Sequence, residues 1–171
     1  EGLFPTFQGP LYPMMLSLFI WIFGLNITLL KSLSLIALIF HLYLFFKAFK
    51  GNVSSTILSF ILIIISFNSY LLYYSSQTFN EAFFMLLQAS LFFLFFKVIN
   101  KQKEEAKWFD YLIIGLFVFL LGITKTIGFS ALFAVLAFLL FEKRWKGSLI
   151  TFFSFVGFYI LLSVVKSYLF D

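Results

Sequence analysis

Long apolar runs, separated by short polar segments, make up most of the chain. A helix that crosses a bilayer needs about 20 mostly apolar residues, because each residue adds about 1.5 Å across a hydrocarbon core of about 30 Å. Six runs meet or approach this length, and each one predicts a transmembrane helix. They are residues 26–46, 53–73, 78–96, 108–124, 126–141 and 148–169.

A shorter apolar run at residues 11–23 precedes these six. It is too short to span a bilayer unaided, and it predicts an interfacial or re-entrant helix. Pro10 and Pro13 suit the start of a helix, where a missing N–H costs nothing, and Gly24 suits its end. The predicted fold is therefore an all-α integral membrane protein, with one short interfacial (juxtamembrane) helix followed by about six transmembrane helices.

The composition agrees with this prediction. Hydrophobic residues are 63% of the chain and charged residues 11%, whereas soluble domains carry about 25% charged residues. So much apolar surface cannot be buried inside a core of this size, so lipid must cover much of it. We expect a single transmembrane domain over residues 1–171, with an outer segment and juxtamembrane helix at 1–25 and a helix bundle at 26–171. The start at Glu1 leads us to expect a segment of a longer polytopic protein.

Basic residues orient the predicted helices. Cytoplasmic loops of membrane proteins carry an excess of Lys and Arg. Nine of the twelve cations fall in alternating connections, which are thereby predicted to be cytoplasmic, with both ends of the chain outside. These nine are Lys47, Lys50, Lys97, Lys101, Lys103, Lys107, Lys143, Arg144 and Lys146. Because they lie between apolar runs and form no stripe with stacking aromatics, the net charge of +5 does not indicate a nucleic-acid partner.

The three remaining cations, Lys31, Lys125 and Lys166, each lie at or about one turn inside the predicted outer end of a helix. A single lysine at such a place can simply extend its ammonium to the headgroups. Three lysines on the outer side, where few Lys and Arg residues are expected, favour the binding of an anion such as a lipid phosphate or pyrophosphate. Ionisable residues inside a membrane are costly, and they are therefore candidates for a functional role.

Glu81 is the carboxylate at the outer end of the third predicted span. Thr78, three residues before it, fits a capping box, so a structural role is as well supported as a functional one. In a site, Glu81 could orient an acceptor, a sugar hydroxyl or a metal. Asp110 is expected to cap its helix, and His41, which has no partner ligand at metal spacing, is expected to pack inside the bundle. The residues themselves predict no metal site.

Three short motifs, taken in order, resemble a known family. They are Gln-Gly-Pro-Leu-Tyr-Pro at 8–13, Phe-Gly-Leu-Asn at 23–26 and Gly-Ile-Thr-Lys at 122–125, with Glu81 opening a helix between the last two. In this order they resemble the membrane-embedded GT-C glycosyltransferases. The closer resemblance is to bacterial relatives of protein O-mannosyltransferases and of the aminoarabinose transferase that modifies lipid A, although Gln8 and Gly9 stand where the latter enzymes have a Glu-Lys pair.

The resemblance implies an enzyme of the bacterial inner membrane that transfers a sugar from a polyprenyl-phosphate donor to a lipid, glycan or protein acceptor at the outer face. Such transfer usually inverts the sugar and in some relatives uses a divalent metal; no other cofactor is implied. The implied donor-phosphate residues are Lys125, Lys31 and Lys166, and the implied substrate-groove residues are Glu81, Tyr12 and Gln8. The catalytic Asp of the family would precede Glu1, so no residue here is assigned that role, and the segment alone is expected to be inactive.

Two other functional classes stay open. A polytopic transporter or flippase would use the same cations to line a substrate path, with polar groups near the bilayer midplane. A membrane assembly subunit without a catalytic site would also be compatible with Phe-rich spans. Proximity of Lys31, Glu81 and Lys125 would favour the enzyme.

Overall fold

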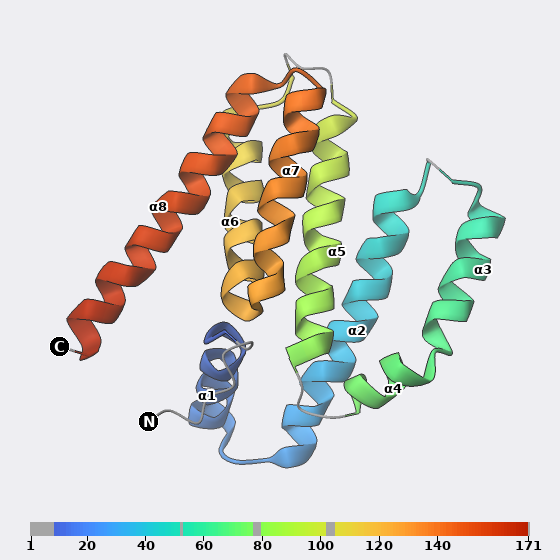
Figure 1. Cartoon of the computed structure of the whole chain (residues 1–171). Helices are drawn as coiled ribbons and strands as arrows, with labels where there is room; N and C mark the ends of the chain where they lie inside the picture. The colour runs from blue at the N-terminus through green and yellow to red at the C-terminus, as the bar shows by residue number, and fades with distance from the viewer. Residues whose placement is uncertain (1–8, 52, 77–79, 102–104, 171) are drawn as a thin grey trace. The chain divides into compact units, whose positions relative to one another are not determined.

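The computed structural model describes residues 9–51, 53–76, 80–101 and 105–170, and these form helices and short connections without a β-strand (Figure 1). The helices, in chain order, are α1 (Leu11–Phe23), α2 (Ile27–Phe49), α3 (Ser55–Ser66), α4 (Ser69–Ser75), α5 (Asn80–Ile99), α6 (Trp108–Thr124), the 3₁₀-helix η1 (Thr126–Phe129), α7 (Ser130–Phe141) and α8 (Trp145–Phe170). The all-helical prediction is confirmed for this part of the chain.

Three of the helices are long and apolar enough to cross a membrane. They are α2, α5 and α8, the last over Trp145–Tyr168. The helix α6 has the bounds predicted from the sequence, but its 17 residues reach only about 25 Å at about 1.5 Å per residue. Six membrane crossings therefore stay a prediction, whereas three helices of sufficient length are observed.

The span predicted at residues 53–73 is wrong as a single helix, because the structure divides it into α3 and α4. The Asn68 side-chain oxygen accepts hydrogen bonds from the backbone N–H groups of Tyr70 and Leu71, at 2.9 and 3.4 Å. It thereby caps a new helix inside an apolar run. Hydropathy does not detect this break, because apolar residues lead up to Ser66 and resume at Tyr70, so the mean hydropathy of the run stays high.

The chain forms two compact units, one over Gly9–Phe96 and one over Lys97–Asp171 together with Glu1–Gln8. We call them the amino-terminal and carboxy-terminal units and describe each by itself. The single domain expected from the sequence remains a prediction.

In the amino-terminal unit, α1 ends at Gly24, whose φ of 73° lies in a region that glycine adopts without steric cost. Asn26 then caps α2 by accepting a hydrogen bond from the Leu29 N–H at 3.2 Å. Further along, His41 of α2 donates from Nδ1 to the Met85 carbonyl oxygen of α5 at 2.9 Å. His41 is thus a packing residue of the bundle, as predicted.

In the carboxy-terminal unit, small residues let α6 and α8 approach closely. A Cβ atom at Gly115 would lie 2.7 Å from Ser154 and from the Thr151 carbonyl oxygen. Thr151 and Ser154 also donate side-chain hydrogen bonds to the carbonyl oxygens of Tyr111 and Leu112, at 3.3 and 2.9 Å. Close packing and interhelical hydrogen bonds of this kind hold helices together where lipid removes the hydrophobic driving force.

Candidate functional site

Tyr12 is the centre of the site that the amino-terminal unit offers. Its side chain is buried where α1 meets α2 and α5. The hydroxyl lies 3.5 Å from Ser34 Oγ of α2, and the ring centroid lies 5.9 Å from that of Phe83 in α5. Two helices that are separated in the sequence by α3 and α4 thus hold one phenol in place.

Glu81, in the first turn of α5, interacts electrostatically with the phenol of Tyr12. Burial raises the pKa of Tyr12 most, the hydrogen bond with Ser34 opposes the rise, and the Glu81 carboxylate adds to it. Tyr12 therefore keeps its proton at neutral pH and can donate a hydrogen bond. Of the predicted site residues, Tyr12 and Glu81 thus interact electrostatically, and their shared role in a site stays a prediction.

An apolar cavity of about 170 Å³ lies beside Tyr12. Its polar side chains are the hydroxyls of Tyr12 and Ser34, at one wall. The remaining lining residues are Met15, Leu16, Leu33, Ile36, Ala37, Phe83 and Leu86. A lining of this kind suits a branched apolar chain and offers few partners to a sugar.

The three predicted phosphate-binding lysines belong to different units. Lys31 is exposed in α2 of the amino-terminal unit, whereas Lys125 and Lys166 belong to the carboxy-terminal unit, the first half-buried and the second exposed. Their proximity to one another and to Glu81 stays a prediction. Gln8 and Glu1, like Thr78 of the expected capping box, lie outside the described residues.

The backbone fixes Lys125 between α6 and η1. Its backbone is extended, with φ −146° and ψ 141°. Its N–H donates to the Leu121 carbonyl oxygen at 3.0 Å, and its own carbonyl accepts from the Gly128 N–H at 2.8 Å. These bonds make a tight turn, which places the lysine between the apolar runs predicted at residues 108–124 and 126–141.

Asn80, which immediately precedes Glu81, was not singled out from the sequence. Only 4% of its surface is exposed, and neither atom of its amide has a hydrogen-bond partner among the residues that the structure describes. A buried amide without partners is costly. The sequence signal available for Asn80 was its position directly before an acidic residue in the first turn of a helix. The same signal is typical of a helix cap.

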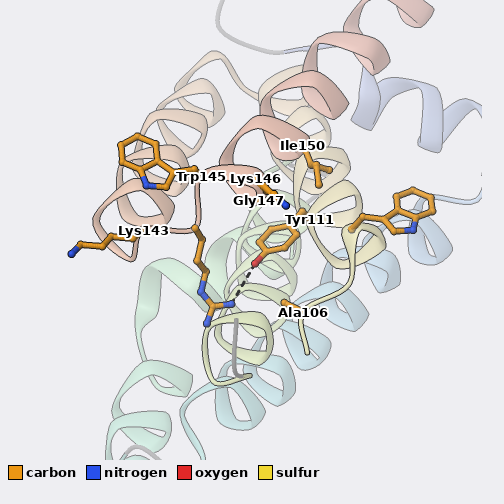
Figure 2. A pocket seen from close by; sticks show the side chains of 9 residues that line it. Ala106, Tyr111, Lys143, Trp145, Lys146, Gly147 and Ile150 are labelled. Carbon is orange, nitrogen blue, oxygen red and sulfur yellow. Dashed lines mark hydrogen bonds between the residues drawn. The ribbon is translucent and has the colours of Figure 1, made fainter. Parts of the chain in front are cut away.

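Arg144 lies in the connection between α7 and α8, at the basic end of the carboxy-terminal unit. The structure places Arg144 in a basic connection, as predicted from the sequence, and only 7% of its surface is exposed. Its terminal nitrogens donate to the carbonyl oxygens of Val98, Ile99 and Lys101 at 3.1, 3.0 and 2.7 Å, and to the Tyr111 hydroxyl at 3.3 Å (Figure 2, dashed line). Carbonyls at the end of α5 lack intrahelical partners, and the guanidinium supplies them.

Asp110 is a cap, as predicted. Its carboxylate accepts from the Lys107 N–H at 3.1 Å and forms a 2.8 Å ion pair with Lys101. Within the described part of the chain, no group of three or more His, Asp or Glu side chains could hold a metal ion.

The fold and these contacts define a helical protein with membrane-type apolar helices. Comparison of the chain with protein-family models, with curated proteins and with solved structures finds no match.

Proposed function

We propose that the protein is a membrane glycosyltransferase, which transfers a sugar from a polyprenyl-phosphate donor to a lipid, glycan or protein acceptor at the outer face of a bacterial inner membrane. The observation that carries this proposal is the apolar cavity against the buried Tyr12, whose phenol also interacts electrostatically with Glu81. A ligand that combines an isoprenoid chain with a polar head needs an apolar groove that ends in a few polar groups.

Each side chain has a role in this proposal. The transfer breaks the bond between the anomeric carbon and the phosphate oxygen and forms one to the acceptor oxygen, whose proton passes to a general base. Glu81 accepts a hydrogen bond from a sugar or acceptor hydroxyl, and the neutral Tyr12 donates one. Lys125, with Lys31 and Lys166, stabilises the negative charge that builds up on the departing phosphate.

The direction of the helices supports an outer-face site. Helices α2 and α5 run parallel, since His41 bonds to Met85 and the rings of Phe49 and Phe96, near their ends, lie 5.3 Å apart. Tyr12 and Glu81 lie near the starting ends of these helices, and the basic connections follow their far ends. If those connections are cytoplasmic, as their charge predicts, the cavity faces the outer leaflet.

Photocrosslinking tests donor binding. The chain is reconstituted in nanodiscs with a photoreactive undecaprenyl phosphate, and the labelled peptides are mapped by mass spectrometry. We expect labels on α1, the first half of α2 and the first half of α5. The substitution Glu81→Gln should lower the yield when a sugar is attached to the phosphate, whereas Glu105→Gln, which changes an exposed carboxylate in a basic connection, should not. Labelling confined to other helices, or an unchanged yield in Glu81→Gln, would contradict the proposal.

A turnover assay tests the chemistry. Membranes from cells that produce the protein should release polyprenyl phosphate from a radiolabelled sugar donor and pass the sugar to an acceptor, and Lys125→Ala should greatly reduce this release. Lys50→Ala, in a basic connection, is the matched control. Unchanged turnover in Lys125→Ala would exclude the assigned role of that lysine. Movement of intact donor across the bilayer would instead indicate a flippase, and absence of donor binding a structural subunit.

A further inference from the structure

A second cavity lies at the basic end of the carboxy-terminal unit, where α6 and α8 begin. Its volume is about 480 Å³. Figure 2 shows it from close by, with Lys143 extending outward from its rim. The residues that line it are Ala106, Trp108, Tyr111, Lys143, Arg144, Trp145, Lys146, Gly147 and Ile150. The proposed glycosyl transfer makes no use of this cavity.

The charge around the cavity is positive. Lys143, Arg144 and Lys146 line it, and no acid is among its described lining residues. Glu105 and Glu142 are adjacent in the sequence to lining residues, but both are exposed to the surroundings. The first turn of α8 contains no acidic residue, so no side-chain carboxylate neutralises the positive end of that 26-residue helix. The cavity is therefore suited to an anion.

Arg144 provides an independent indication of a ligand. It lines the cavity and is buried, and its terminal nitrogens are all engaged by the protein. Its Nε, however, has no hydrogen-bond partner among the described residues. Buried N–H groups of native proteins almost always have a partner, and an anion seated in the cavity is a suitable one.

The surroundings of the cavity favour a lipid over a soluble anion. Trp108 and Trp145 line the cavity and are 64% and 63% exposed, and tryptophan is enriched where a membrane meets water. Leu149 and Phe153 follow Trp145 at four-residue intervals on α8, and both are exposed. Because residues four apart share a helix face, these side chains form an apolar strip that leads away from the basic cavity along the helix.

We propose that this cavity binds the phosphate of an anionic lipid headgroup, such as that of phosphatidylglycerol, with the acyl chains along the Trp145, Leu149 and Phe153 strip of α8. Basic pockets between helices at the cytoplasmic side of a membrane are suited to anionic lipids. This inference requires only that the chain be embedded in a bilayer, and it does not depend on glycosyl transfer.

Tryptophan fluorescence tests the proposal directly, because the chain has only three tryptophans. In the Trp21→Phe variant, the two that remain are those of the cavity. This variant is reconstituted in phosphatidylcholine vesicles that contain a small fraction of lipid with brominated acyl chains, either phosphatidylglycerol or phosphatidylcholine. Bromine quenches tryptophan on contact. We expect markedly stronger quenching by the brominated phosphatidylglycerol.

Charge-matched variants identify the site. Adding Lys143→Ala and Lys146→Ala should weaken the preference for phosphatidylglycerol roughly 10- to 30-fold, whereas Lys47→Ala with Lys50→Ala, which removes the same charge from the amino-terminal unit, should leave it unchanged. Lys143→Arg with Lys146→Arg should retain it. Equal quenching by the two lipids, or equal loss in both alanine pairs, would overturn the proposal. Loss of the preference in inorganic phosphate, but not in chloride of equal ionic strength, would show that the cavity takes a free anion and would overturn the lipid assignment.

Discussion

The guanidinium of Arg144 connects three parts of the carboxy-terminal unit through hydrogen bonds. The Arg144 side chain donates to carbonyls at the end of α5 and to the phenol of Tyr111 in α6, and its backbone carbonyl accepts from the Ser148 N–H at the start of α8. The substitution Arg144→Met keeps the apolar stem and removes the guanidinium donors of these carbonyls. We expect it to lower the free energy of unfolding by about 2–4 kcal/mol. Thermal unfolding in detergent, followed by circular dichroism, measures this loss.

Lys143→Ala is the control for Arg144, since it removes the neighbouring charge from an exposed side chain. A surface charge of this kind contributes about 0–1 kcal/mol, so the unfolding transition should move little. Equal destabilisation by the two substitutions would mean that net charge, and not the hydrogen bonds of the guanidinium, stabilises this end of the unit.

Tyr12→Phe separates binding from stability at the candidate site. The Tyr12 hydroxyl lies 3.5 Å from Ser34 Oγ, at the outer limit of a hydrogen bond, so we expect a loss of less than about 1 kcal/mol in unfolding free energy. Crosslinking of the sugar-bearing donor should nevertheless fall. A large drop in thermal stability together with unchanged crosslinking would assign Tyr12 to packing alone.

Individual residues were predicted well where their role is local and poorly where it depends on distant partners. Asp110 was expected to cap α6 and does so, because a cap is made within one helical turn. Arg144 was correctly placed in a connection, but the sequence gives no sign of its carbonyl partners, which lie more than 40 positions away. A count of loop charges cannot detect such contacts.

At the scale of elements, the interface of α6 and α8 depends on Gly115. We expect Gly115→Leu to cost about 1–3 kcal/mol, because a side chain there would overlap Ser154 and the backbone of Thr151 and the helices would have to separate. Gly157→Ala is the matched control, since a Cβ atom at this position of α8 meets nothing within 4 Å. Unfolding in detergent should distinguish the two variants. A loss at Gly157 as large as that at Gly115 would contradict this account of the interface.

The break between α3 and α4 depends on Asn68. Replacing it by Ala removes the side-chain acceptor of two N–H groups and should cost about 1 kcal/mol, the usual contribution of a helix cap. Hydrogen exchange followed by mass spectrometry should show faster exchange in α4 and little change in α8. Slower exchange throughout residues 55–73 would instead mean that the two helices fuse when the cap is lost.

The ends of helices were predictable where a strong sequence signal coincides with the end of an apolar run. Pro10 and Gly24 bound α1, and the polar connections on both sides bound α6, so both helices begin and end where the sequence predicted. The α3–α4 break was missed because a single capping asparagine hardly changes the mean hydropathy of a run of about 20 residues. Hydropathy therefore predicts which segments are apolar and gives less information on whether each is one helix.

For the whole molecule, the main question is how many helices cross the membrane. Length and hydropathy identify three, whereas alternation of the basic connections predicts six crossings. The chain has no cysteine, so single cysteines can be introduced for labelling without a background. Ser55→Cys and Ser76→Cys flank α3 and α4, and both positions are exposed. If these helices together cross the bilayer, a membrane-impermeant maleimide added outside intact cells should label residue 76 and spare residue 55.

The same assay tests α6 and places the two cavities. Glu105→Cys precedes α6 and Thr126→Cys follows it, and both positions are exposed. Six crossings predict that only residue 126 is labelled from outside. Because α2 and α5 run parallel, the chain must return across the bilayer between them if both cross it. If α6 does not cross, residues 105 and 126 share the side at which α5 ends. That result would move η1 and Lys125 to the side of the Arg144 cavity, and Lys125 could then not bind the phosphate of a donor held beside Tyr12.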